Sequence, residues 1–275
     1  MRSGGPLSMP TPPRTAAQVL EMQASSDVFR LDDVTFVGDH GRTTVSRLSL
    51  SAKPGSATAL VGHVGGGKTT VLRLLAALVV PQSGSVRVFD TDLATLSYEE
   101  LRRHRMRVGY SFESTGLVGN MSIGENIALP LRYHYLLGER ADEKVKELAL
   151  ELEIEDYLDE PCFRVNGSVR KRALTARALA LEPKLLLCDE PQVGLTRREA
   201  CLVSDAIDRR RLVNGLSVVF ADHDGYLDPF VVSRTFYLEN GRLLTAPSMR
   251  PRTDREVAPL PERLSLSTDL IYRGS

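Results

Sequence analysis

A glycine-rich segment at residues 62–69 matches the pattern G-x-x-x-x-G-K-[ST], and it is the feature that most constrains the fold of this chain. The short, largely apolar run of residues 57–61 precedes it and predicts a buried strand. Residues 69–80 follow it without an internal breaker and carry apolar side chains at helical spacing, including Leu74 and Leu78. Because a strand, a glycine loop and a helix in this order are typical of a phosphate-binding loop, we expect this segment to bind a nucleoside triphosphate.

Each part of this segment has an expected role. Glycine allows consecutive backbone N–H groups to turn toward a phosphate chain, and the following helix adds its positive N-terminal end. Lys68 is expected to reach the β- and γ-phosphates, and the hydroxyl of Thr69 to ligate Mg²⁺. A glycine turn that only caps a helix is the alternative, and the flanking strand and helix favour phosphate binding. The expected nucleotide-binding residues here are Gly62, His63, Val64, Gly65, Gly66, Gly67, Lys68, Thr69 and Thr70.

Two later apolar runs end in side chains that suit phosphate chemistry. Residues 185–188 lead into Asp189 and Glu190. An acid at a strand end is needed to hold Mg²⁺ beside a triphosphate, so Asp189 is a candidate metal ligand. Glu190 is a candidate general base that polarises the attacking water. Residues 218–221 lead toward His223, a candidate contact for the γ-phosphate or the water, although a single histidine is more often structural.

The composition narrows the class of protein. The 35 basic and 35 acidic residues cancel, so no nucleic-acid partner is expected. The 3 cysteines show no metal-ligand spacing, which fits a reduced cytosolic compartment. The longest apolar run, residues 74–80, is far too short to span a membrane, and prolines stand near the N-terminus in place of a hydrophobic signal core. If the protein acts at a membrane, we expect other subunits to supply the spanning helices.

The pattern along the chain predicts one α/β domain between two tails. Residues 1–26 are rich in Pro, Ser, Gly and Ala and predict a disordered tail, and residues 247–275 form a second tail. Within residues 27–246, β-type runs alternate with helical runs, which indicates an α/β core with a parallel sheet. Residues 113–172 show no strand pattern, and residues 141–152 place apolar side chains on one face of a charged helix. This middle part is therefore expected to be an all-helical insertion.

Taken together, these elements resemble the ATP-binding subunit of an ABC transporter, over about residues 28–246. The segment 62–69 is similar to that family's Walker A loop. Residues 185–190 are similar to its Walker B strand with the catalytic glutamate, and His223 to its switch histidine. The stretch 170–179 resembles the helix that follows the family's signature motif.

The resemblance implies a P-loop NTPase fold, with a RecA-like core around a parallel sheet, an antiparallel β subdomain and an inserted α-helical subdomain. It implies ATP and Mg²⁺ as cofactors, with Lys68, Glu190 and His223 as the catalytic residues. It also implies transmembrane permease subunits as partners, and either a homodimer or a heterodimer with another ABC ATPase subunit. Such a protein would lie in the cytoplasm, peripheral on the inner face of the membrane.

The chain departs from the family pattern at several of these positions. The signature L-S-G-G-Q is here V-N-G-S-V, in which only Gly167 matches outright. Asn166 and Ser168 still offer hydrogen-bond donors to a nucleotide held by the opposite subunit. Glu113 stands where a metal-sensing glutamine is expected; it can ligate Mg²⁺ but brings a negative charge near the phosphates. Thr196 replaces an aspartate that contacts the other subunit. The signature motif is thus expected to be degenerate.

These departures leave several functions open. A weakly active homodimer and a heterodimer, whose partner supplies an intact signature, are both compatible with the sequence. Residues 116–132 and 189–194 are similar to the corresponding stretches of MCE-type, Mla-like ATPases, which move lipids between bacterial membranes. The rivals are a degenerate ATP-binding subunit with a regulatory or assembly role and an ABC ATPase outside transport. Glu190 argues against the first rival, and the balanced charge gives no nucleic-acid signal for the second.

Overall fold

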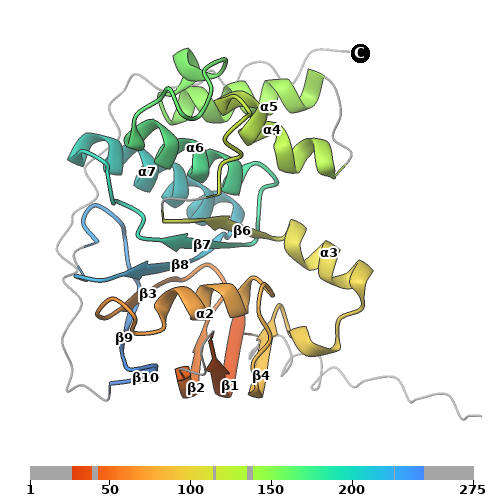
Figure 1. Cartoon of the computed structure of the whole chain (residues 1–275), viewed down its shortest axis with the longest axis vertical. Coiled ribbons are helices and arrows are strands. Elements are labelled where there is room, and N and C mark those ends of the chain that lie inside the picture. The colour runs from red at the N-terminus through yellow and green to blue at the C-terminus, as the bar shows by residue number, and fades with distance from the viewer. Residues whose placement is uncertain (1–26, 39–42, 114–115, 135–138, 226, 245–275) are drawn as a thin grey trace, which may run out of the picture.

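The computed structural model describes residues 27–38, 43–113, 116–134, 139–225 and 227–244. Both expected tails lie outside the described residues. Within the described part of the chain, two β-sheets and the helices between and beside them form the mixed α/β architecture drawn in Figure 1.

The larger sheet has the strand order β10-β9-β3-β8-β7-β6 among the described residues. In that order the strands are β10 (Arg242–Leu243), β9 (Arg234–Glu239), β3 (Ala57–Val61), β8 (Ser217–Asp222), β7 (Leu185–Asp189) and β6 (Val108–Ser111). The strands from β9 to β6 are parallel, and β10 is antiparallel to β9. β3, β7 and β8 are buried along their whole length, as their apolar sequences predict for a parallel sheet covered on both faces.

The smaller sheet is antiparallel and has the order β2-β1-β4-β5 in the described part of the chain. Its strands are β2 (Thr43–Ala52), β1 (Phe29–Val37), β4 (Ser83–Val88) and β5 (Thr91–Asp92). Alternate residues of β1, such as Phe29 and Leu31, are buried, because successive side chains of a strand point to opposite faces. The sheet therefore presents one apolar face to the rest of the molecule.

Helix α2 (Lys68–Leu75) lies between the two sheets, as Figure 1 shows. Its apolar residues share one buried cluster with Leu60 of β3 and with the inner face of the smaller sheet. On the opposite face of the larger sheet, Ala57 and Ala59 of β3 share a second cluster with α6 (Gly167–Leu179) and α7 (Arg197–Asn214). The loop that joins β3 to α2 is thus fixed at both ends by buried elements.

The predicted helix over residues 69–80 is shorter in the structure, where α2 ends at Leu75. Ala77 has φ 52, and this left-handed conformation cannot continue a right-handed helix. Leu78 consequently lies beyond the helix and is 47% exposed. The expectation that Leu78 belongs to the apolar face of this helix was wrong.

The middle of the chain is helical, as its sequence pattern predicts. It contains α4 (Ile123–Tyr133) and α5 (Glu139–Glu151) and the start of α6, while α3 (Tyr98–Met106) precedes it. The expected apolar face of α5 and the residue after it is buried at Ala141, Val145, Leu148 and Leu152. Helix α6 continues past residue 172 and packs against β6, so it joins the helical part to the sheet. None of the described helices is both long and apolar enough to cross a membrane.

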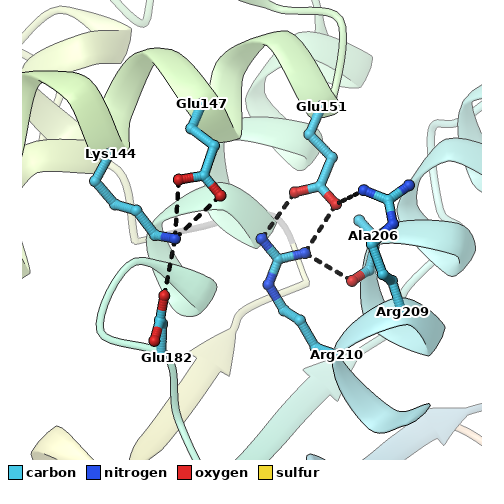
Figure 2. Close-up of polar contacts among 7 residues, drawn as sticks. All are labelled: Lys144, Glu147, Glu151, Glu182, Ala206, Arg209 and Arg210. Carbon is cyan, nitrogen blue, oxygen red and sulfur yellow. Dashed lines mark hydrogen bonds and ion pairs between the residues drawn. The ribbon is translucent and has the colours of Figure 1, made fainter. Parts of the chain in front are cut away.

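Ion pairs also hold α5 to its neighbours, as Figure 2 shows. The Glu151 carboxylate lies 2.7 Å from Nη1 of Arg209 and 2.8 Å from Nη2 of Arg210, both on α7. The Lys144 ammonium lies 3.1 Å from the Glu147 carboxylate and 2.9 Å from that of Glu182, which follows α6. The helical part is therefore attached to the core by charged contacts as well as by apolar packing.

Candidate active site

The expected phosphate loop leaves the buried end of β3 and enters the first turn of α2. Gly67, the residue before the helix, has φ 99, a conformation that L side chains rarely adopt. A Cβ there would also collide with the carbonyl oxygen of Thr44, so the loop is packed directly against β2. No side chain caps the start of α2 among the described residues, which leaves its first backbone N–H groups to the loop and to an incoming anion.

Lys68 is held beside this loop. Its side chain is buried, and its ammonium donates hydrogen bonds to the carbonyl oxygens of Gly62 at 2.6 Å and His63 at 3.1 Å. The ammonium therefore lies against the backbone that is expected to surround the phosphates. His63, Val64 and Gly65 form the exposed part of the loop, where a ligand has access.

The two expected metal ligands meet between α2 and β7. The hydroxyl of Thr69 donates a hydrogen bond to Oδ1 of Asp189 at 3.2 Å. Asp189 ends a fully buried strand, and burial raises the pKa of its carboxyl above the ordinary value, with the charge of Glu113 adding to the effect. A hydroxyl and a carboxylate are oxygen donors of the kind that Mg²⁺ prefers. The pair fits a magnesium ion because a cation would favour the ionised form of the buried carboxylate.

Glu190 lies at the next position, in a strained backbone conformation. Its φ of 47 is left-handed, which costs a residue other than glycine about 1–2 kcal/mol. Its carboxylate Oε2 lies 2.9 Å from Nδ1 of His223, so β7 and β8 bring the two expected catalytic side chains together. Burial raises the pKa of Glu190, although the hydrogen bond from His223 works against this. A raised carboxyl pKa suits a general base.

His223 is held from two sides. Besides the contact with Glu190, its Nε2 lies 3.1 Å from the carboxylate of Asp224. The hydrogen bond to Glu190, followed by that residue's charge, raises the pKa of the imidazole. The neighbouring Asp222 accepts hydrogen bonds from the backbone N–H groups of Asp224 and Gly225 at 3.1 and 2.6 Å. This turn fixes the position of the histidine relative to the end of β8.

A residue that the sequence patterns did not single out joins Glu113 to this group. Lys171 of α6 is buried, and its ammonium donates to the carbonyl oxygens of Phe112 at 3.0 Å, Glu113 at 3.1 Å and Asp189 at 2.7 Å. Burial lowers the pKa of Lys171 to about 8, against the opposing charges of Asp189, Glu113 and Glu190. The signal that could have found it is a lysine in the middle of a largely buried helical run.

The residues of the expected signature lie elsewhere, at the start of α6. The side chain of Asn166 caps this helix by accepting a hydrogen bond from the N–H of Val169 at 2.9 Å. The hydroxyl of Ser168 donates to the carboxylate of Glu199 on α7, which also pairs with Arg172 at 3.2 Å. The structure therefore engages Asn166 and Ser168 within the chain and does not join them to Lys68, Thr69 or Glu190.

Thr196 has a local role that the expected aspartate would share. Its side chain caps α7, and the Thr196 N–H donates a hydrogen bond to the Glu199 carboxylate at 2.8 Å, which completes a capping box. Glu199 consequently links the start of α7 to the start of α6. The loop after Glu190 and the signature residues are thus parts of one hydrogen-bonded group.

Comparisons with known proteins agree with this geometry. The family model described as "ABC transporter" matches residues 45–193. The methionine import ATP-binding protein MetN of Geobacillus kaustophilus is 31% identical over 202 residues, which are 74% of this chain and 59% of that protein. Its counterpart in Campylobacter jejuni is 32% identical over 217 residues, which are 73% of this chain and 65% of that protein. The chain thus spans less than two thirds of the length of these curated relatives.

Solved structures give the same result for the fold. A bacterial ABC transporter cassette, solved as a dimer, superposes with a TM-score of 0.75 at 25% sequence identity and covers 81% of this chain and 99% of its own. Its likeness confirms the expected α/β fold, with a parallel sheet and an antiparallel one. Because the family model covers more than half of the sequence, including the phosphate loop and Asp189 with Glu190, the chain belongs to the ABC transporter family.

Proposed function

We propose that this protein is the subunit of an ABC transporter that binds and hydrolyses ATP. The observation that carries the proposal is the contact at 3.2 Å between Thr69 and Asp189, with Lys68 in the same loop and the Glu190–His223 pair at the next position. These are the groups that phosphoryl transfer to water requires: a phosphate cradle, a cation, a metal site and a base. Family membership supports the same assignment.

In the proposed mechanism, the loop at residues 62–69 binds the phosphates of ATP, and side chains at the ends of β7 and β8 catalyse the hydrolysis. Backbone N–H groups of residues 62–69 and the Lys68 ammonium hold the β- and γ-phosphates. Thr69 and Asp189, with the carboxylate of Glu113, would hold Mg²⁺, which neutralises charge on the phosphate oxygens. As the oxygen of the attacking water bonds to the γ-phosphorus, Glu190 accepts a proton from that water. The bond between the γ-phosphorus and the β–γ bridging oxygen breaks, and ADP is the leaving group. His223 orients the Glu190 carboxylate through the hydrogen bond at 2.9 Å.

The proposed partners are permease subunits and a second ATPase subunit. A dimeric cassette among the similar structures supports dimerisation, and the relatives are named as import ATP-binding proteins. The proposed permease surface is a groove of about 390 Å³, which is lined by Leu129 and Pro130 of α4 and by the stacked rings of Tyr110 and Phe112 on and after β6. A subunit docked there would lie in the cytoplasm, peripheral on the inner face of the membrane.

The cargo is proposed from the names of the relatives. Proteins that are 28% to 32% identical to this chain are named for methionine import, which supports import of a small polar solute. The expected link to Mla-like lipid transport has no support from these relatives. Import of a small solute is therefore the cargo class that we propose.

One observation favours a second candidate function, a subunit that binds ATP for regulation or assembly. The hydroxyl of Ser168 donates a hydrogen bond to the Glu199 carboxylate, and the side chain of Asn166 caps α6. Donors that are engaged within the chain are less available to the nucleotide of an opposite subunit. A pair of such chains would then bind ATP but hydrolyse it slowly.

Steady-state ATP hydrolysis by the purified chain tests the proposal, with Glu190→Gln and Lys68→Ala as paired variants. Glu190→Gln should keep ATP affinity and lose turnover by about 10²–10⁴-fold, because it removes the base. Lys68→Ala should weaken ATP binding by roughly 10–100-fold, because a charged hydrogen bond is worth about 1.5–3 kcal/mol. ATP binding without turnover in the wild-type chain would favour the second candidate. Absence of ATP binding would contradict both.

A further inference from the structure

Lys171 and Lys68 are the buried lysines of the described residues, and Lys171 has the larger number of main-chain acceptors. Its side chain is 3% exposed, and its ammonium donates to three main-chain carbonyl oxygens, at 2.7 to 3.1 Å. An ammonium has three hydrogens, so its hydrogen-bonding capacity is fully used. Burying this group is costly unless each hydrogen finds an acceptor, and here each one does.

The three acceptors lie where two strands of the larger sheet stop pairing. The ladder between β6 and β7 ends at the pair Ser111 and Cys188. The next residues along the two strands are Phe112 and Asp189, and both direct their carbonyl oxygens to the Lys171 ammonium. The lysine therefore connects the two chain segments one residue beyond the end of the ladder. Its third acceptor is the carbonyl of the next residue, Glu113.

The connected segments carry two of the groups that would share a magnesium ion. Asp189 provides the buried carboxylate beside Thr69, and Glu113, on the loop after β6, is near enough for its charge to act on Asp189. The lysine charge also lies among the negative charges of Asp189, Glu113 and Glu190, whose mutual repulsion it opposes. One side chain thus acts on both the spacing and the charge of this group.

We propose that Lys171 is a positioning residue of the metal site. By holding the backbone of Glu113 against that of Asp189, it fixes the separation at which their carboxylates bind one divalent cation. The inference rests on the proposed function, because it assumes that this site holds a metal with a nucleotide. Lys171 itself touches neither the metal nor the nucleotide.

The test compares Lys171→Met, which keeps the length of the side chain but removes its charge and donors, with Lys171→Gln, which removes the charge but keeps an amide NH₂ as a donor group. The readout is Mn²⁺ binding by the full chain in the presence of a non-hydrolysable ATP analogue, followed by electron paramagnetic resonance. Groups that orient metal ligands typically contribute 10–100-fold to metal affinity. Lys171→Met should therefore raise the Mn²⁺ dissociation constant by about tenfold, and Lys171→Gln by less. Affinity for the analogue in EDTA should change less than about twofold.

Lys144→Met is the matched control, because Lys144 also makes several polar contacts but lies on α5, with Glu147 and Glu182 as its partners. It should leave the Mn²⁺ dissociation constant unchanged. If both Lys171 variants bind Mn²⁺ like the wild type, or lose metal and metal-free analogue to the same extent, the inference is overturned and the proposed function stands. If Lys171→Met does not fold, Lys171→Gln decides between these outcomes. A wild-type chain that binds neither analogue nor Mn²⁺ would remove the proposed function and the inference together.

Discussion

Two histidines of this chain have pKa values that move in opposite directions, for reasons visible in their contacts. His223 lies partly exposed between Glu190 and Asp224, and the hydrogen bond to Glu190 raises its pKa. His104 lies on α3 with Nε2 3.3 Å from the carbonyl of Leu75, and burial lowers its pKa. The surroundings of His223 therefore favour the charged imidazole, and those of His104, between α2 and α3, favour the neutral one.

His104 should make the stability of the protein depend on pH. Its folded pKa is below the ordinary value of 6.5, so the unfolded chain takes up this proton first as the pH falls. The stability contributed by the neutral ring is present above about pH 6.5 and is lost as the pH falls through the folded pKa. Between pH 7 and 5, the wild type should lose more free energy of unfolding than His104→Gln, measured by urea denaturation. Equal losses would contradict this account.

Single residues also mark the limit of what the sequence predicts. Lys68, Thr69, Asp189 and Glu190 follow from motifs, because phosphate and metal chemistry demand those side chains at the ends of buried strands. The role of Lys171 does not, because its acceptors are main-chain carbonyls that have no signature in the sequence. The engagement of Ser168 by Glu199 depends in the same way on the packing of α6 against α7.

At the scale of elements, one carboxylate of α5 makes ion pairs with two arginines of α7. Glu151 pairs with Arg209 and makes a bidentate ion pair with Arg210. The side chains of Glu151 and Arg210 are each only 11% exposed. Glu147 lies one turn earlier on the same helix and pairs with Lys144, but its side chain is 60% exposed. The two glutamates, whose contacts Figure 2 shows, offer a matched comparison of a buried and an exposed ion pair.

Glu151→Gln should destabilise the protein by about 3 kcal/mol, because it leaves Arg210 buried without its counter-charge. Glu147→Gln should cost less than about 1 kcal/mol, since an exposed pair contributes little. Chemical denaturation of both variants measures the difference. If the two costs are equal, burial does not decide the strength of these pairs, and the attachment must come from apolar packing.

The sequence predicted the helices and strands well where local residue pattern determines them. It predicted them poorly where tertiary packing determines where an element ends or what it contacts. The strands β3, β7 and β8 were expected from short apolar runs, because a strand buried on both faces needs no polar side chain. The end of α2 was missed, because the left-handed turn at Ala77 uses a residue that has high helix propensity. A helix over residues 170–179 was expected from the family resemblance, but its packing against β6 was not, since buried alanines fit either environment.

At the scale of the whole molecule, the position of Gly167 allows a test of the proposed dimer. A Cβ at Gly167 would meet only Nη2 of Arg170, at 3.9 Å, among the described residues, so a side chain fits there. An acid in the first turn of a helix is also favourable for the helix itself. Gly167→Asp should therefore fold normally while placing a negative charge in the loop that would face the partner's γ-phosphate.

We expect Glu190→Gln to form a dimer with ATP and Mg²⁺, and Glu190→Gln with Gly167→Asp to remain monomeric, in size-exclusion chromatography with light scattering. Gly119→Asp is the matched control, because a Cβ at Gly119 meets nothing within 4 Å and the residue is outside α6. A dimer that persists with Gly167→Asp would exclude the signature loop from the interface. A Glu190→Gln chain that binds ATP but stays monomeric would indicate that a different subunit completes the dimer.

The order of the larger sheet has a consequence for synthesis on the ribosome. β3 carries the phosphate loop and emerges early, yet its two neighbours, β8 and β9, begin at Ser217 and Arg234. The hydrogen bond from the N–H of Gly55 to Ser217 spans 162 residues, and that from Ala57 to Ser233 spans 176. At roughly 5–20 residues per second, the nascent chain carries an unpaired, largely apolar strand for on the order of ten seconds or more. The segment that gives the finished protein its nucleotide site is thus the one that most needs protection by chaperones before the last strands arrive.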